Sequence, residues 1–463
     1  MYQIDRNREL NAELITDAID FNERRRKRFN RLYDYYCGRQ DILNREKFGE
    51  ALSNNKLMVN HARYIVDVGT GYLLGNPVSY QADDGEDIQP VIDQYKRQAI
   101  DNLDSKLAKD VAIFGVGYEY IYADEDSNPC SVALDVRNTI IIYDNSMVHD
   151  KLYGVNYRPI YKNPEDSVPE YYEVVVASKD KIQAFKLRGK VTLELLSEQP
   201  NSFGKVPFIE YLNNDEALGD FEPVISLIDA YNLIQSDRVN DREQLVDAIL
   251  CFRGMKFDAD QMDDLREHRA LSGIPADGDV FYLTKNISEA DNDVLRQNLE
   301  KDIHKISMVP NMSDENFAGN ASGVALKYKL LTFEQNTKNK ERYFEKGLKE
   351  RFAMYTHFLS LKSQMQEIPI EDVDAIFVRN LPANDYETSQ MINNLVGTVD
   401  KKLLVSQLSF VQDAEETVEL AEEESSSQAK DDEYAAGDFA DSNAVANATE
   451  STDDAQPSAL DEE

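Results

Sequence analysis

Hydrophobic residues recur at helical spacing over the first 75 residues of the chain. One stripe with a period near 3.6 residues predicts an amphipathic helix; it comprises Met58, Ala62, Ile65, Val66, Gly69, Tyr72 and Leu73. Gly69 and Gly71 weaken this helix by roughly 1 kcal/mol each, which indicates close packing against another helix. Asn76-Pro77 ends the helix, and the following residues are typical of a strand.

Five consecutive basic residues, Arg24 to Arg28, precede a cluster of tyrosines and Gly38. A basic stripe beside aromatic residues suits nucleic-acid binding. It is more often the solvated face of a helix that packs on its other side. We therefore favour a solvated helix face, with Gly38 as the helix stop.

A β-rich body follows a helix predicted over 101–117. Its short apolar or alternating runs are separated by Asp, Asn, Pro and Gly turns, as in a meander or small sandwich with mostly antiparallel pairing. The seven runs are YEYIYAD (118–124), CSVALDV (130–136), NTIIIYD (138–144), LYGVNYRPIY (152–161), EYYEVVVAS (170–178), KIQAFKL (181–187) and VTLELLS (191–197).

A long helix is predicted over 221–250, about 45 Å at 1.5 Å per residue. Its first part has an apolar stripe, whereas its middle, QSDRVNDREQ, is polar nearly all round. A polar waist of this kind suits packing between like neighbours with one face wet. A β-α-β insert follows, with strands at 253–257 and 279–284 and a helix at 259–271, and a helix then returns over 291–308.

Turn-forming residues fill the segment from Val309 to Gly323, which predicts a loop. A helical pattern of nearly 40 residues begins at 324, a strand is predicted over 374–381, and an amphipathic helical region covers 385–423. The whole order of elements predicts an α+β, predominantly helical fold.

The chain is acidic, with a net charge of −36 over 463 residues, and its length suggests two to four domains. Residues 411–463 hold 18 acidic residues and one lysine, so this segment carries almost half of the charge. From about Glu424 it lacks the apolar residues needed to fold, and we predict disorder. The rest is still acidic, which excludes an ordinary DNA-binding protein that grips phosphates.

Three cysteines far apart in the sequence argue for a reducing compartment and against a disulfide framework. No apolar run approaches the length of a membrane span, and no signal peptide opens the chain, so neither a membrane nor secretion is expected. A cytoplasmic site of synthesis is the default.

The motifs expected of an enzyme are missing. The glycines at 69, 71 and 75 form G-x-G-x-x-x-G, and Leu73 and Leu74 stand where a cofactor would need glycine. The five histidines show no metal-ligand spacing. Asp241, Glu243 and Asp247 could hold a nuclease metal, but solvated charges on a polar helix are the ordinary interpretation. We therefore expect no enzyme, no catalytic residue, no cofactor and no metal site.

The chain resembles the portal proteins of tailed double-stranded-DNA bacteriophages, in the family typical of phages of Gram-positive hosts. The segments that carry the resemblance are YDYYCGRQDIL (33–43), NKLMVNHARYIVDVGTGYLLGNPVSY (55–80), FGKVPFIEYLNN (203–214), GDFEPVISLIDAYNLIQSD (219–237) and MSDENFAGNASGVALKYKLLTFEQNTKNKERYFEKGLKER (312–351). Their number and order span nearly the whole chain except its acidic tail.

The resemblance implies a portal-type fold with wing, stem, clip and crown, assembled as a ring, commonly a dodecamer. The implied domains are a wing at 1–220, a stem helix at 221–247, a clip at 248–292 and a second stem helix at 293–309. They continue with a tunnel loop at 310–323, a long wing helix and strand at 324–383, crown helices at 384–424 and the disordered acidic tail at 425–463.

A protein of this family would form the DNA channel at one capsid vertex of the virion and nucleate procapsid assembly. The implied partners are terminase large subunit, a head-tail connector or adaptor, the major capsid and scaffolding proteins, and double-stranded DNA that passes without sequence specificity. The residues expected beside DNA in the tunnel loop are Asn311, Ser313, Asp314, Glu315, Asn316, Phe317, Gly319 and Asn320. The partner-binding residues expected in the clip are Asp263, Asp264, Arg266, Glu267, His268 and Arg269.

Three alternatives stay open at this point. The chain could be a carboxylate-metal nuclease or a cofactor-binding transferase, which an activity assay would detect. It could also be a head-completion or scaffolding protein without a channel. Within the portal interpretation, the loop could instead be a buried connection anchored by Phe317, with Ser322 capping the next helix.

Overall fold

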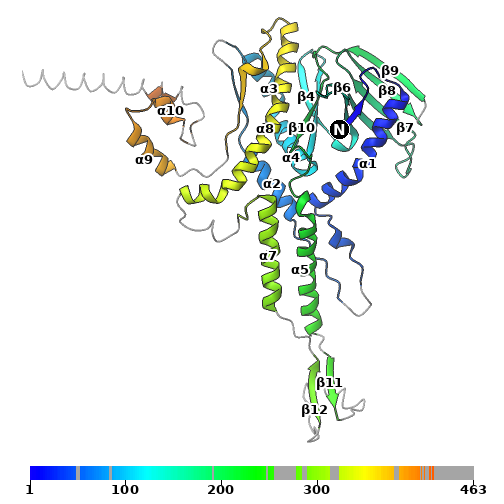
Figure 1. The fold of residues 1–463 in the computed structure, drawn as a ribbon, viewed down its shortest axis with the longest axis vertical. Coiled ribbons are helices and arrows are strands. Elements are labelled where there is room, and N and C mark those ends of the chain that lie inside the picture. Colours follow the sequence, from blue (N-terminus) through cyan, green and yellow to red (C-terminus); the bar gives the residue numbers. More distant parts are fainter. Residues whose placement is uncertain are drawn as a thin grey trace, which may run out of the picture. The chain divides into compact units, whose positions relative to one another are not determined.

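The computed structural model divides the chain into two compact units, residues 1–380 and 381–463 (Figure 1). It describes all residues except 48–52, 83–85, 190–191, 247–248, 255–277, 284–288, 313–322, 380–384, 407, 409–410, 412–416, 419 and 422–463. Among the described helices, none is long and apolar enough to cross a membrane.

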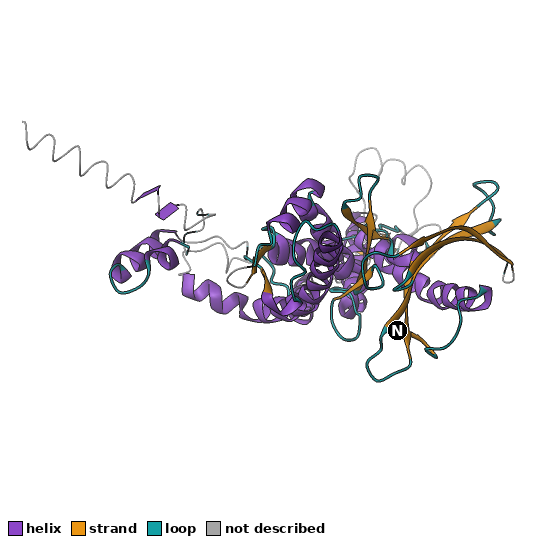
Figure 2. Ribbon diagram, turned by 90° about the horizontal axis from the view of Figure 1, so that it is seen from above, coloured by secondary structure: helices purple, strands orange, loops and turns teal. Residues whose placement is uncertain are grey.

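A six-stranded sheet forms one layer of the first unit, with strand order β1-β5-β6-β7-β8-β9. The strands are β1 (Tyr2–Ile4), β5 (Thr139–Asp144), β6 (Lys151–Ile160), β7 (Tyr171–Ala177), β8 (Lys181–Arg188) and β9 (Thr192–Pro200). β1 is parallel to β5, and all other neighbours pair antiparallel. Figure 2 shows these strands as a curved layer to one side of the helices.

Helix α1 (Ala12–Tyr36) packs its apolar face on this sheet. Leu14, Ile15, Ala18 and Ile19 recur at helical spacing and are buried against strand residues that include Val155. Asn11 caps the helix by accepting the amide of Leu14. The prediction that the first residues are helical was wrong at Tyr2–Ile4, because pairing with β5 makes this segment a strand.

The basic run on α1 is only partly solvated. Arg24 and Lys27 are exposed, as predicted. Arg28 instead contacts both carboxylate oxygens of Glu222 and donates to the carbonyl of Ala217 at 2.7 Å. Gly38, with φ of 83°, follows the end of α1 and confirms the predicted stop.

A second core lies around a three-stranded sheet of order β10-β3-β4. Its elements are β3 (Val116–Ala123), β4 (Pro129–Leu134), β10 (Phe208–Leu212), α3 (Gln89–Gln98), α4 (Ile100–Phe114) and α8 (Gly323–Leu361). Two glycines permit close packing here. A Cβ on Gly347 of α8 would lie 2.3 Å from the ring of Tyr211, and one on Gly154 of β6 would lie 2.2 Å from that of Phe208. All seven predicted strands of the β-rich body and the long helix after 323 are confirmed. The helix predicted over 101–117 is α4, but it ends at Phe114, because Val116 and Gly117 pair in β3.

The glycine-containing segment is helix α2 (His61–Leu74), and its predicted stripe is buried from Ala62 to Leu73. A Cβ on Gly69 would contact the carboxylate of Asp220 at 3.4 Å, whereas Gly71 has nothing within 4 Å. The contact at Gly69 is an ordinary van der Waals distance to a loop residue, so the predicted close packing against another helix is not found at either glycine. After α2, β2 (Ser79–Ala82) pairs antiparallel with β13 (Val373–Ile376).

Two antiparallel helices and a hairpin complete the first unit: α5 (Ile225–Val246), β11 (Ile249–Arg253), β12 (Asp279–Leu283) and α7 (Glu289–Ser307). The predicted helix 221–250 is shorter than expected, because Ile249 to Arg253 pair with β12 instead of extending the helix. The first strand of the insert therefore lies before 253–257. The predicted helix at 259–271 lies outside the described residues.

Short 3-10 turns are at Asp41–Asn44 (η1), Val136–Asn138 (η2), Glu222–Val224 (η3) and Ile370–Asp372 (η4). The described part of the second unit contains α9 (Asp385–Leu395) and α10 (Lys401–Val405). Asp400 caps α10 by accepting the amides of Lys402 and Leu403.

Candidate functional site: the helix pair and its junction with the body

Helices α5 and α7, called here the helix pair, lie side by side and lead from the body to the β11–β12 hairpin (Figure 1). Arg238 of α5 forms an ion pair with Asp293 of α7 at 3.3 Å. Ile303 of α7 and Tyr231 of α5 are buried. The pair is therefore a packed unit rather than two separate helices.

The polar waist of α5 holds an extended segment, residues 53–59, called here the strap. The amide of Val59 donates to Asn232 Oδ1 at 2.8 Å, that of Leu57 to Ser236 Oγ at 2.9 Å, and that of Asn55 to Asn240 Oδ1 at 2.7 Å. Four residues of helix rise about 6 Å, and two residues of extended chain span about 6.6 Å. The two spacings match, so each turn of α5 meets every second residue of the strap.

This contact gives the waist of α5 a partner that was not expected, since packing between like neighbours with one face wet was predicted there. Asn232, Ser236 and Asn240 are all buried, because the same chain covers them. Their spacing of four residues in the sequence was the signal that could have revealed a polar stripe with a dedicated partner. The identity of the partner could not be inferred, since the strap lies about 180 residues earlier in the chain.

The junction between the helix pair and the body holds the start of the predicted loop. Tyr64 of α2 donates its hydroxyl hydrogen to the carbonyl of Pro310 at 3.1 Å and accepts the amide of Met312 at 2.8 Å. His304 Nδ1 lies 2.9 Å from the carbonyl of Val309. Helices α2 and α7 therefore fix the position from which the loop leaves the body.

A buried histidine lies at the same junction. The ring of His61 packs edge-on against Tyr231, with centroids 4.7 Å apart, and 5.8 Å from the ring of His304. Burial, with a smaller contribution from the charge of His304, lowers the pKa of His61 from 6.5 to about 4. His61 is therefore neutral at pH 7, and its protonation opposes the folded junction.

We expect His61→Phe to reduce the acid sensitivity of the fold. In the wild type, the unfolded chain binds a proton at His61 below pH 6.5 but the folded chain does not until about pH 4. This difference removes about 3 kcal/mol of stability over that window as the pH falls. Urea unfolding at several pH values should show a shallower slope in the variant. An unchanged slope, equal to that of the control His149→Asn at an exposed histidine, would contradict this assignment.

Of the residues predicted to be functional in the loop and in the clip, the structure describes only one. Asn311 is described, and its side-chain amide donates to Glu300 of α7 at 2.9 Å, which ties it to the helix pair. The other predicted sites lie outside the described residues: Ser313, Asp314, Glu315, Asn316, Phe317, Gly319 and Asn320 in the loop, and Asp263, Asp264, Arg266, Glu267, His268 and Arg269 in the insert.

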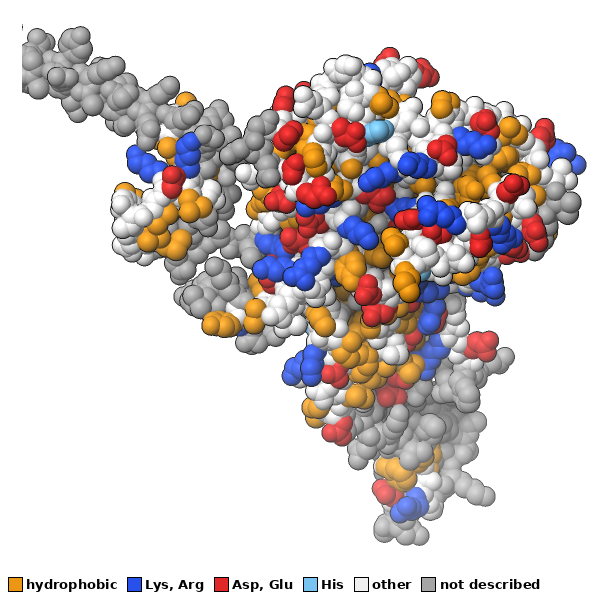
Figure 3. Space-filling view, turned by 45° about the horizontal axis from the view of Figure 1, so that its top comes forward, with side chains coloured by type: hydrophobic (Ala, Val, Ile, Leu, Met, Phe, Trp, Pro, Cys, Tyr) orange, Lys and Arg blue, Asp and Glu red, His pale blue; other side chains and the backbone are white. Residues whose placement is uncertain are grey.

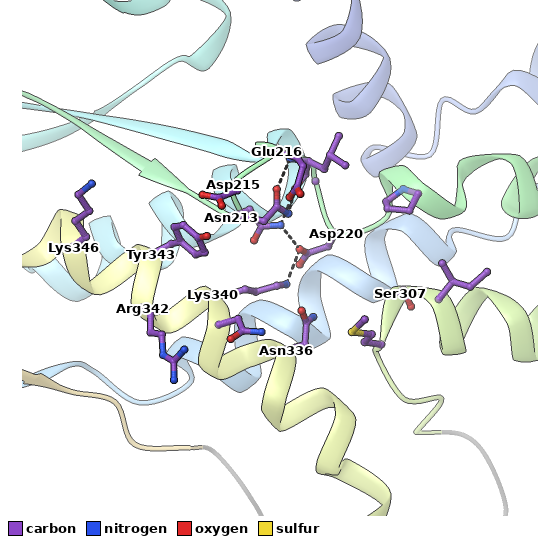
Figure 4. Close-up of a pocket in the computed structure, with 17 residues that line it drawn as sticks. Asn213, Asp215, Glu216, Asp220, Ser307, Asn336, Lys340, Arg342, Tyr343 and Lys346 are labelled. Atoms are coloured by element: carbon purple, nitrogen blue, oxygen red, sulfur yellow. Dashed lines mark hydrogen bonds and ion pairs between the residues drawn. The ribbon is translucent and has the colours of Figure 1, made fainter. Parts of the chain in front are cut away.

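A pocket of about 710 Å³ lies between α8, the loop after β10 and the end of α7 (Figure 4). Lys340 points at Asp220 across it, with Nζ 2.6 Å from the carboxylate. Asp220 also accepts the side-chain amide of Asn213 at 2.8 Å. The central charges are thus paired with one another, and they join α8 to the body.

The carboxylates weighed as a metal site have structural contacts. Glu243 accepts the side-chain amide of Asn55 at 2.7 Å, at the end of the strap. Asp247 lies outside the described residues. Within the part of the chain that the structure describes, no three His, Cys, Asp or Glu side chains are grouped so that they could hold a metal ion.

The architecture is that of a mixed helical and β body that carries an antiparallel helix pair and a hairpin. Residues 17–431 match the family model described as phage portal protein, SPP1 Gp6-like. The chain belongs to this phage portal protein family, as its resemblance at the sequence level implied. The family is structural, and its members are virion components.

Two relatives identified by sequence agree with this assignment. The chain is similar to the portal protein of Bacillus phage SPP1, with 24% identity over 405 residues, 83% of this chain and 79% of that protein. It is also similar to the portal protein of Clostridium phage phiCD119, with 22% identity over 447 residues, 91% of this chain and 97% of that protein. A chain in the neck of an empty GTA particle superposes with a TM-score of 0.42 and 12% identity, over 78% of this chain and 89% of that chain.

Proposed function

We propose that this chain assembles into the ring-shaped channel through which double-stranded DNA enters and leaves the capsid at one vertex. The observation that carries the proposal is the helix pair, whose apolar side chains are not all covered by the chain itself. Leu295 and Ile306 of α7 are each 49% exposed, and Leu233 of α5 is 42% exposed. Apolar residues left at the surface of packed helices indicate a protein partner, and a second copy of a portal protein is the natural one.

The proposed domains follow the elements of the structure. The wing comprises the body from residue 1 to about 220 and the long helix α8, and the helix pair is the stem. The hairpin β11–β12 belongs to the clip, which would dock terminase large subunit during packaging and a head-tail connector afterwards. Residues 310–323 are the tunnel loop and 384–424 the crown. Capsid and scaffolding proteins would meet the outside of the ring as the procapsid forms.

The charge of the chain suits a channel that DNA passes without adhering. Residues 1–410 carry −19 of the net charge of −36, so the body of the chain is acidic and would repel phosphates instead of binding them. In the proposed tunnel loop, Asp314 and Glu315 would repel the DNA backbone and Phe317 would supply an apolar contact. The anchoring of the loop at Tyr64 and His304 would hold its base while its tip faces the channel.

Replacing Asp314 and Glu315 with lysine is expected to leave assembly intact and to slow DNA packaging, most strongly at low salt. The added cations would bind phosphates through counterion release. The matched control is Glu125→Lys with Asp126→Lys, a double charge reversal in an exposed turn of the body. Packaging into procapsids, measured over a range of salt, should separate the two variants; equal rates would show that the loop does not meet DNA.

Charge reversal at Arg266 and Arg269 tests the clip assignment. We expect the double variant to assemble normally but to bind terminase and the connector more weakly, because the docking surface changes its charge. Pull-down of each partner by the assembled variant is the measurement. Wild-type binding of both partners would remove the support for this assignment.

A further inference from the structure

The helix pair has two different uncovered faces, and helix geometry places them on opposite sides. On α7, Leu295 precedes Arg296, whose side chain interacts with Tyr231 of α5, and Ile306 is exposed like Leu295. They are eleven residues apart, which is about three turns, so they share one side. An approximate two-fold axis relates two antiparallel helices, and it is perpendicular to the plane that contains both helix axes. The residues that precede the contact positions on α5 therefore lie on that same side.

The front face of the helix pair is defined here as Leu227 and Ile234 of α5 with Leu295 and Ile306 of α7. The two α5 residues are partly exposed, and the two α7 residues are each 49% exposed. Figure 3 shows hydrophobic side chains gathered on the helix pair beneath the body. One acid interrupts the α7 stripe: Asp302 is exposed and lies seven residues after Leu295, on the same side.

The opposite side of the pair carries a groove between the strap and α5. The groove has a volume of about 360 Å³, and it is lined by Leu57, Met58, Val59, Gln235, Arg238, Val239 and Arg242. Val239 directly follows Arg238, which contacts α7, and a residue in this position lies on the side of the pair opposite to the front face. Leu57 and Val59 are 39% and 37% exposed, so apolar surface is open here too. The guanidinium groups of Arg238, which is paired with Asp293 of α7, and of Arg242 line this side.

We propose that the front face of one copy packs into the groove of the next copy. Both surfaces expose apolar side chains, and the contact would bring the carboxylate of Asp302 on the front face near the guanidinium of Arg242 at the groove. Since the surfaces differ and lie on opposite sides of one unit, their contact is heterologous and can repeat from copy to copy, and it forms a ring where the rotation between copies closes. The inference rests on the proposed portal function and adds that the strap, not a helix alone, forms the receiving surface.

The strap is suited to this role because α5 holds it rigidly. Its amides at 55, 57 and 59 are bound to the helix, and its leucine and valine side chains are directed into the groove. A neighbouring front face would bury Leu57 and Val59 without reordering them. Packing of two front faces would instead oppose Asp302 to Asp302 across a two-fold axis, and it would stop at a dimer.

Disulfide trapping tests the pairing of the two surfaces. In a chain with Cys37 and Cys251 replaced by serine, we expect Leu57→Cys with Leu295→Cys to give a ladder of covalent oligomers on mild oxidation. Leu295→Cys alone is the control, and it should give no covalent product. Covalent dimers from that single variant would show that two front faces meet, and the proposal would be overturned.

A charge exchange tests the same contact without new cysteines. Arg242→Asp and Asp302→Arg should each raise the concentration needed for half assembly at least tenfold, and the double variant should recover most of it. Thermal melts monitored by circular dichroism check that each variant is folded. If electron microscopy shows rings, but the cysteine pair gives no covalent oligomers and the double charge variant does not recover assembly, this interface is overturned. The proposed portal function would still stand. A wild-type chain that forms no ring would contradict both.

Discussion

Arg351→Met is expected to lower the free energy of unfolding of the first unit by about 3–5 kcal/mol, the usual range for breaking a buried ion pair from one side. Arg351 of α8 is fully buried. Its Nε donates to Glu119 of β3 at 2.7 Å, and its Nη2 lies 2.6 Å from Asp104 of α4. The substitution removes one cation and leaves two buried carboxylates. Burial already raises the pKa of Asp104, although Arg351 opposes that rise.

The matched control for this substitution is Arg342→Met, on the same helix but exposed, where we expect a change within about 0.5 kcal/mol. Chemical unfolding followed by circular dichroism measures both variants. Adding Asp104→Asn and Glu119→Gln to Arg351→Met should recover part of the loss, because no buried charge then remains. Equal stability of Arg351→Met and Arg342→Met would show that the buried cluster does not hold α8 to the sheet.

Asn232→Leu is expected to release the strap from α5 and to cost about 3 kcal/mol. The side chain of Asn232 is fully buried and makes two hydrogen bonds, one from the amide of Val59 and one to Gln40 Oε1 at 2.6 Å. Leucine fills a similar volume but leaves both partners unpaired, at about 1–3 kcal/mol each. Because the strap forms one side of the proposed interface, assembly should weaken as well.

Hydrogen exchange localises this effect. In Asn232→Leu, the amides of Leu57 and Val59 should exchange faster than in the wild type, while those of the six-stranded sheet stay protected. Leu233→Ala, one residue along and exposed, is the control and should leave exchange at the strap unchanged. Unchanged protection of Leu57 and Val59 in Asn232→Leu would mean that the polar stripe of α5 does not hold the strap.

The sequence pattern predicted the elements that periodicity alone can specify. The stripe from Ala62 to Leu73 gave the buried face of α2, and the alternating runs between 118 and 197 gave seven strands of the body. Both signals depend on residues that are close in the sequence. Repeats of two or 3.6 residues therefore carry them without knowledge of tertiary contacts.

The features that the sequence did not predict depend on contacts between residues far apart in the chain. β1 is a strand because it pairs with β5 some 140 residues later, and three residues are too few for a pattern. The polar waist of α5 was expected to pack between like neighbours with one face wet, since nothing near it in sequence indicates the strap. The cluster of Arg351, Asp104 and Glu119 joins three elements, and each residue alone resembles a surface charge. The loop residues from Ser313 and the clip residues from Asp263 stay predictions.

The native mass and the electron-microscopic image of the purified chain test the central claim most directly. The account predicts a closed homo-oligomer, seen end-on as a ring with a central hole, at micromolar concentration and physiological salt. The apolar front face and groove of the helix pair supply the driving force for this assembly. A stable monomer under those conditions, or an assembly without a central hole, would contradict the account.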